Sequence, residues 1–109
     1  MDEPEIYIAD NSDLAVFESE NKGYRLDVYV CISNEIFKVS LYEIQRLMED
    51  YNKEMKFHNY FLTDPNLIIV KSIDSDNIAL TIKALAANDF FSLIKPIKRA
   101  DIDFPLYPL

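Results

Sequence analysis

Residues 24–39 read YRLDVYVCISNEIFKV, and this stretch gives the clearest indication of the fold. Apolar side chains alternate with other residues along its first nine positions. The alternating set is Tyr24, Leu26, Val28, Val30 and Ile32. A strict period of two is typical of a β-strand that buries one face. Because Ser33-Asn34-Glu35 has turn-type composition, residues 36–39 are expected to return as the second strand of an antiparallel hairpin.

A helix is expected directly after this hairpin. Ser40 and Glu43 have the spacing of a capping box, in which the serine caps the helix and the acid bonds back to the cap. Val39 can pack on Ile44 as a hydrophobic staple. The sequence therefore predicts a helix from Leu41 to about Lys56. Its apolar stripe would consist of Ile44, Leu47, Met48, Tyr51 and Met55.

Two short strands are expected before the hairpin. Residues 6–8 and 14–18 are rich in apolar side chains, and the polar run 10–13 between them has turn-type composition. Gly23 is the only glycine and marks a tight connection into the strand that starts at Tyr24. The two short strands would join the same sheet.

The second half of the chain predicts a meander of three strands. Residues 67–73 have high β-propensity, the polar run 74–77 forms a turn, and residues 78–86 return with alternating apolar side chains. Residues 90–95 would be the last strand. A competing interpretation makes residues 84–94 a short helix, because Ala-Leu-Ala-Ala is helix-prone.

These elements predict one α+β domain over residues 1–109, with a curved antiparallel sheet of about five to six strands and one main helix packed on one face. A composition that is 50% hydrophobic allows a core without disulfides or metal. The tail, residues 100–109, contains Pro105 and Pro108 and is otherwise largely apolar. We expect the tail to fold back on the domain; the alternative is an exposed patch for an oligomer contact.

Negative charge is concentrated at the start of the chain. Residues 1–21 contribute −7 of the net charge of −8, because they contain seven acids and no Lys or Arg. Such a region repels nucleic acids and anionic membranes and attracts basic proteins. The candidate protein-binding residues are Asp10, Asp13, Glu18, Glu20, Asp27 and Tyr29. The alternative is a solvated surface that keeps an acidic protein soluble.

Few residues are suited to catalysis or metal binding. His58 is the only histidine and Cys31 the only cysteine, so a His–His pair and a structural zinc site lack ligands. We expect His58 in a partly exposed loop and Cys31 as a small buried residue. With one glycine, the chain has no glycine-rich phosphate loop. The run 74–79 begins like a calcium loop but lacks its glycine, and Leu85 occupies the place of the closing glutamate.

These observations predict no catalytic residues, no metal and no cofactor, and a protein that is not an enzyme. Lys95, Lys98 and Arg99 form the one basic cluster, which is a poor footprint for nucleic acid. No apolar run approaches the roughly 18 residues that span a bilayer. An acidic N-terminus interrupted by Pro4 does not fit a secretory signal. We therefore expect a cytoplasmic protein that has a protein partner.

Four segments together carry a resemblance to a known class of proteins: the acidic opening 1–5, the hairpin 24–39, the capped helix 40–55 and the meander 67–97. In size, acidity and order of elements the chain resembles small bacterial immunity proteins that neutralise toxin domains, such as those of contact-dependent growth inhibition. The resemblance implies stoichiometric protein–protein inhibition of a cognate toxin domain, expected to be a basic nuclease, and it assigns no individual residue.

Two other classes of function remain open. The first is a structural or assembly subunit of a phage or secretion system, which would oligomerise through a sheet edge or through its C-terminal tail. The second is an enzyme or ligand-binding domain that uses its carboxylates inside a curved sheet. The scarcity of His, Cys and Gly places that possibility last.

Overall fold

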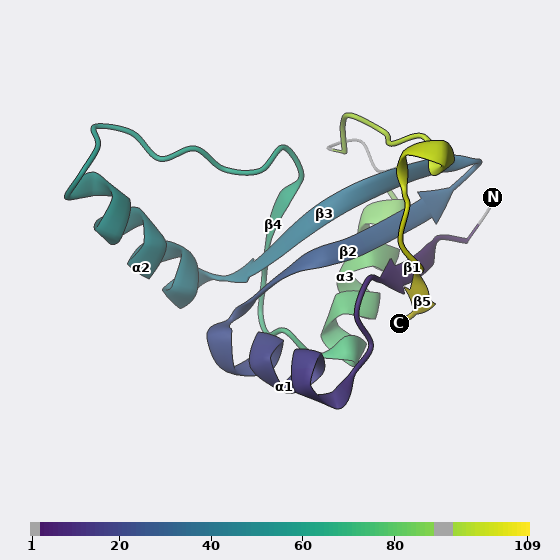
Figure 1. The fold of residues 1–109 in the computed structure, drawn as a ribbon, viewed down its shortest axis with the longest axis horizontal. Helices are drawn as coiled ribbons and strands as arrows, with labels where there is room; N and C mark the ends of the chain where they lie inside the picture. Colours follow the sequence, from purple (N-terminus) through teal and green to yellow (C-terminus); the bar gives the residue numbers. More distant parts are fainter. Residues whose placement is uncertain (1–2, 89–92) are drawn as a thin grey trace.

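The computed structural model describes residues 3–88 and 93–109, and in these residues the protein is α+β, with one open sheet and three α-helices (Figure 1). The strands are β1 (Glu5–Ile8), β2 (Tyr24–Ile32), β3 (Glu35–Glu43), β4 (Leu67–Val70) and β5 (Tyr107–Pro108). Their order is β4-β3-β2-β1-β5, with β3 and β4 parallel and the other neighbours antiparallel. The predicted fold class is confirmed, although the sheet is mixed and not wholly antiparallel.

The predicted hairpin of residues 24–39 is confirmed and forms the centre of the sheet. Ser33 and Asn34 turn the chain with φ of 49° and 67°, and positive φ at both central residues is what the tightest hairpin loops require. Strand β3 continues beyond the predicted end to Glu43. The hairpin therefore extends further from the turn than its sequence pattern indicated.

Helix α3 (Ser75–Ala86) covers one face of the sheet, and the core lies between them (Figure 1). Ile78, Ile82 and Ala86 recur every four residues and are all buried. The sheet contributes Ile8, Val28, Val30, Phe37, Val39, Leu41 and Val70 to the same core. Removing this apolar surface from water, at roughly 25 cal/mol per Å², is the main term that stabilises the fold.

The strand predicted at residues 78–86 is wrong, because these residues belong to α3. The carboxylate of Asp74 caps the helix by accepting a hydrogen bond from the backbone N–H of Asn77 at 2.8 Å. The competing interpretation of residues 84–94 as a helix agrees with the structure only over residues 84–86, which are the last residues of α3. The strand predicted at 90–95 lies partly outside the described residues, and residues 93–95 have no regular structure.

Helix α1 (Asp13–Lys22) occupies the place where a strand was predicted at residues 14–18. Ser12 caps it, because its Oγ accepts a hydrogen bond from the backbone N–H of Ala15 at 3.2 Å. Gly23 ends it with φ of 77°, and its N–H donates to the carbonyl of Ser19. These two caps make the segment helical despite its strand-like apolar run.

Helix α2 (Ile44–Met55) confirms the predicted helix, but its predicted start is wrong. Ser40 lies inside β3 and is 2% exposed, and its hydroxyl donates to Oδ2 of Asp64 at 2.7 Å. Val39 points into the core and forms no staple. The helix also does not pack on the sheet: it projects from one end of the molecule, and every one of its residues stays at least partly exposed (Figure 1).

The rest of the chain returns to the sheet at its two edges. Strand β4 confirms the beginning of the strand predicted at 67–73, but it runs parallel to β3, so the predicted meander is wrong. The tail folds back as expected: Tyr107 pairs with Ile8, and Leu109 donates its N–H to the carbonyl of Ile6. The tail thereby adds β5 beside β1.

Candidate functional site

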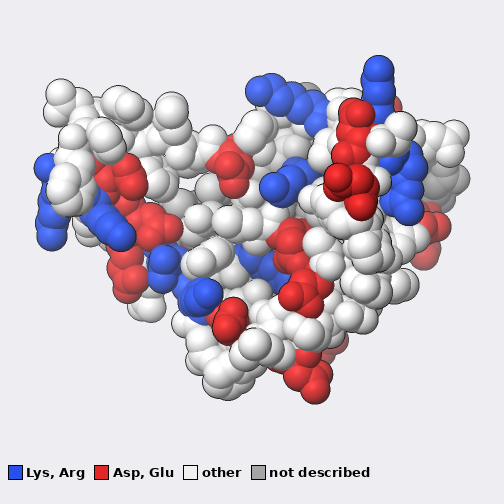
Figure 2. Space-filling view, in the orientation of Figure 1, with Lys and Arg blue, Asp and Glu red and all other residues white. Residues whose placement is uncertain are grey.

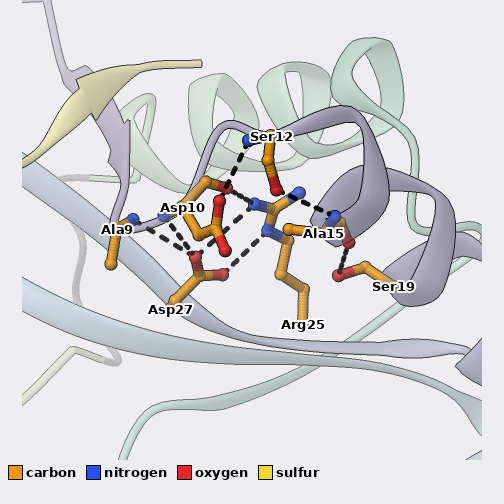
Figure 3. A network of polar contacts seen from close by, with 7 residues as sticks. All are labelled: Ala9, Asp10, Ser12, Ala15, Ser19, Arg25 and Asp27. Carbon is orange, nitrogen blue, oxygen red and sulfur yellow. Dashed lines mark hydrogen bonds and ion pairs between the residues drawn. The ribbon is translucent and has the colours of Figure 1, made fainter.

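Arg25 is the buried charge that organises the N-terminal part of the molecule. The residue is 5% exposed, and a buried guanidinium is tolerated only where it is paired and hydrogen-bonded. Its Nε donates to Oδ1 of Asp27 at 2.8 Å, and its Nη2 donates to the backbone carbonyl of Asp10 at 2.6 Å (Figure 3). The guanidinium therefore joins β2 to the turn between β1 and α1.

Asp27 completes this connection with its second oxygen. Oδ2 accepts hydrogen bonds from the backbone N–H groups of Ala9 and Asp10 at 3.2 and 3.1 Å (Figure 3). The carboxylate of Asp10 accepts in turn from the backbone N–H of Ser12, which holds the pKa of Asp10 below its usual range. Because Ser12 is the cap of α1, one chain of polar contacts leads from β2 to the first turn of that helix.

The outward face of α1 combines large apolar side chains with carboxylates. Leu14 and Phe17 are one turn apart and are each 65% exposed. At roughly 100° per residue, Asp13 and Glu20 lie on one side of this pair and Glu18 lies on the other. All three acids are exposed. We call these five residues the α1 face; it has an apolar centre and an acidic rim.

A hollow of about 420 Å³ lies beside α1 and over β2. Four of the six residues predicted to bind a protein line it, namely Asp10, Glu18, Asp27 and Tyr29. Three cations line it as well, namely Lys22, Arg25 and Lys38. Lys22 lies 3.6 Å from Glu18, and Arg25 is paired with Asp27, so the hollow itself is close to electrically balanced. The exposed acids Asp13 and Glu20 of the α1 face do not line this hollow.

Tyr29 does not have the exposed position expected of a binding residue. It is 6% exposed, and the ring of Phe104 from the tail packs against it with the centroids 5.8 Å apart. Burial raises the pKa of its hydroxyl above the usual range. In this fold Tyr29 packs under the tail, and Asp27 holds the turn, so these two residues of the predicted set have structural roles.

The sequence prediction missed Leu14 and Phe17. It placed both in a strand, where residues three apart face opposite sides, whereas in a helix they share a face. A pattern that could have identified the helix was present: Ser12 and Gly23 are a favoured N-cap and a favoured C-terminal residue on either side of a ten-residue segment.

The two residues with the greatest chemical reactivity lie away from the α1 face. Cys31 is half-buried, and burial raises the pKa of its thiol, which opposes formation of a nucleophilic thiolate. His58 is exposed as predicted, 3.6 Å from Glu54 and stacked on the ring of Tyr60. Within the described residues no group of three or more His, Cys, Asp or Glu side chains could hold a metal ion.

Acidic and basic side chains are mixed on two other parts of the face that Figure 2 displays. Figure 2 shows acidic and basic side chains intermingled over α2 and over the end of the sheet that the tail covers. Among the helices of the described part of the chain, none has the length and apolar character needed to cross a membrane.

Comparison with known proteins adds no family. No family model, curated protein or solved structure matches this chain. The functional argument therefore depends on the geometry of the surface.

Proposed function

We propose that this protein is an immunity protein that binds a basic toxin domain, expected to be a nuclease, and inhibits it stoichiometrically without turnover. The α1 face is the observation that carries this proposal. A helix that contributes no buried residue to its own domain gains its stability from caps and neighbours, and its side chains remain available to a partner. An apolar centre with a polar rim is also the usual anatomy of a protein interface.

The negative charge around the α1 face indicates a basic partner. The rim consists of Asp13, Glu18 and Glu20, and Lys22 neutralises only part of it. Complementary potentials accelerate encounter and exclude partners of the same sign. A nuclease has a basic cleft because it must bind phosphates. Carboxylates that are held on a helix could occupy that cleft and block the substrate.

Phe17 and Leu14 would hold the complex after encounter. Interfaces owe most of their affinity to a few buried side chains at the centre, and aromatic residues are frequent among them. The Arg25 network fixes the start of α1 before binding, so little conformational entropy would be lost when the partner docks. We therefore expect the acids of the rim to determine the rate of association, and Leu14 and Phe17 to determine the rate of dissociation.

The first experiment tests the function itself. An immunity gene is expected directly downstream of its toxin gene, so the C-terminal domain of the protein encoded upstream should be co-expressed with this chain. We expect a 1:1 complex in solution and rescue of growth when the toxin domain is produced. Growth arrest despite stable co-expression, with no complex formed, would contradict the proposal.

The second experiment tests the α1 face with a charge-matched control. Changing Asp13, Glu18 and Glu20 to Lys should slow association at least tenfold at low salt, and the difference should shrink as salt is added. Changing the exposed residues Glu35, Asp101 and Asp103 to Lys alters the net charge equally and should leave the rate within about twofold. Asp10 is left unchanged because its carboxylate bonds Ser12.

The contribution of the apolar pair, Leu14 and Phe17, is tested by the rate of dissociation. Phe17→Ala should speed dissociation at least thirtyfold, corresponding to the roughly 2 kcal/mol that defines a central interface residue. Leu80→Ala on α3, which removes a side chain that is 67% exposed, should leave dissociation unchanged. Equal effects of the two substitutions would exclude the α1 face as the centre of the interface.

A further inference from the structure

Asp10 lies between β1 and α1, and it forms hydrogen bonds to three other residues (Figure 3). Its backbone N–H donates to Oδ2 of Asp27 at 3.1 Å. Its carbonyl accepts from Nη2 of Arg25 at 2.6 Å, and its Oδ1 accepts from the N–H of Ser12 at 3.0 Å. Asp10 therefore connects the Arg25–Asp27 pair to the cap of α1.

Apolar packing contributes little to the attachment of α1 to the sheet. Within this helix, Ala15, Val16 and Ser19 are partly buried and no residue is fully buried. Hydrophobic stabilisation scales with the apolar area removed from water, and this area is small for alanine and serine. A helix of ten residues is also shorter than the roughly 12–15 residues at which isolated helices are marginal in water. The hydrogen bonds at the ends of α1 therefore determine what fraction of the molecules has this segment in helical form.

The side chain of Asp10 is not placed like the acids of the α1 face. Asp10 precedes the cap of the helix by two residues, and it lines the hollow beside α1, which Leu14 and Phe17 do not line. Its carboxylate is already engaged by the backbone of Ser12. A scan that reverses the charge of exposed acids would nevertheless group Asp10 with Asp13, because both substitutions would weaken binding to a basic partner.

We infer that Asp10 is a positioning residue for toxin binding: it holds α1 in the helical form that presents Leu14 and Phe17, and its carboxylate does not contact the toxin domain. This role rests on the proposed inhibition by the α1 face. When only a fraction of a protein has the binding conformation, the apparent dissociation constant rises in inverse proportion to that fraction. Loss of the Asp10 side chain thus weakens toxin binding through the helical fraction of α1.

Alanine and asparagine at position 10 separate positioning from charge. Both substitutions remove the same charge, but asparagine keeps an oxygen that can accept from the N–H two residues later. In the free protein, Asp10→Ala should lower the helical fraction of residues 13–22 by about threefold, a change of the size expected for loss of one capping interaction. Asp10→Asn should stay within about 1.5-fold of the native fraction. Cα chemical shifts of these residues measure the fraction without the toxin domain.

The kinetics of toxin binding should follow this helical fraction. Asp10→Ala should slow association by about the same threefold, and Asp10→Asn should leave it nearly native. Dissociation should change by less than about twofold in both variants, because the bound state contains helical α1 in each case. The difference between the two variants should persist at high salt, whereas the effect of the triple Lys variant should shrink.

Ser12 offers a second way to change the same helical fraction. Ser12→Ala removes the oxygen that accepts from the N–H of Ala15, whereas Ser12→Asp keeps an acceptor at the cap. Ser12→Ala should therefore slow association in proportion to its lower helical fraction. Ser12→Asp should remain within about twofold of the native protein. The Ser12 and Asp10 variants should then fall on one line when the association rate is plotted against the helical fraction.

Three results would overturn the positioning role. They are an unchanged helical fraction in Asp10→Ala, equal slowing of association by alanine and asparagine at position 10, and native toxin binding despite a lower helical fraction. In each of these cases the native chain still forms its toxin complex, so the proposed function stands. If the native chain forms no complex, the proposed function fails and the positioning role fails with it.

Discussion

At the scale of single residues, the Arg25–Asp27 pair shows how a charged group is accommodated in a buried position. Arg25 is 5% exposed, and its guanidinium donates to the carboxylate of Asp27 and the carbonyl of Asp10. The N–H of Ala9 donates to the same carboxylate and stabilises its negative charge. The net contribution of such a pair to stability is small, but removal of one partner leaves a charge unpaired in a region of low dielectric.

Asp27→Ala is therefore expected to lower the free energy of unfolding by about 3 kcal/mol, as is typical when one partner of a buried pair is lost. Urea denaturation followed by circular dichroism measures this change. Asp103→Ala removes an exposed acid and should change stability by less than about 0.5 kcal/mol. Similar losses for both variants would mean that the pair has no special role.

Asp74 gives a prediction for pH. Hydrogen bonds from the hydroxyl of Ser72 and the N–H of Asn77 hold the pKa of Asp74 below its usual range. Since the folded state favours the charged form, the contribution of Asp74 is complete above the pKa of the unfolded chain, near 4, and is lost as the pH falls through the lower pKa of the folded state.

Asp74→Asn keeps a side chain that can cap α3 but removes the titration. The native protein should exceed this variant in stability at pH 6, and the difference should shrink as the pH falls below the pKa of the unfolded chain, near 4. Thermal unfolding over a series of pH values from 6 downward measures the difference. A constant difference between the two proteins at all pH values would show that the charge of Asp74 does not contribute.

At the scale of elements, one corner of the molecule joins the two projecting helices. Gly23 ends α1, and the N–H of Glu43, which precedes α2, donates to the Gly23 carbonyl at 2.8 Å. A Cβ at position 23 would lie 3.2 Å from Cβ of Arg46 and 3.3 Å from Oε2 of Glu43. Glycine is required there twice, for its left-handed backbone and for its lack of a side chain.

Gly23→Ala is expected to cost about 1–2 kcal/mol of stability from the left-handed backbone alone. Gly23→Asn introduces the same Cβ, but asparagine tolerates this backbone conformation better. The asparagine variant should therefore lose less stability in chemical denaturation. An alanine variant as stable as the native protein would show that neither the backbone angle nor the contact with α2 is restrictive.

At the scale of the whole molecule, the core and the α1 face are separate. The core lies between the sheet and α3, and α1 and α2 contribute no buried residue to it. Because of this separation, residues on the outward sides of α1 and α2 can be substituted without loss of the fold. It also implies uneven local stability, because helices with little burial open more readily than the strands of a core.

Hydrogen exchange should show this division. Backbone amides of α2 should exchange orders of magnitude faster than those of β2 and β3 in dilute protein, because α2 has no buried residue. Amides of β2 serve as the internal control. Protection of α2 equal to that of β2 in dilute protein would contradict the division.

Local sequence patterns alone were sufficient to predict part of this protein's structure. The alternation from Tyr24 to Ile32 and its turn specified the central hairpin, because a period of two fits only one regular structure. The acidity of residues 1–21 and the apolar tail were also plain in the sequence. The stripe from Ile44 to Met55 identified a helix, though not its partner.

Tertiary structure decided what the local patterns left ambiguous. Short apolar runs fit a strand or a helix equally well, so caps and packing made helices of residues 13–22 and 75–86. Ser40 has the chemistry of a cap but lies in β3, since pairing with β2 and β4 outweighs a local cap. The periodicity of a sequence indicates which side chains share one face of a helix or strand. Only the assembled fold determines whether that face is buried or remains open to a partner.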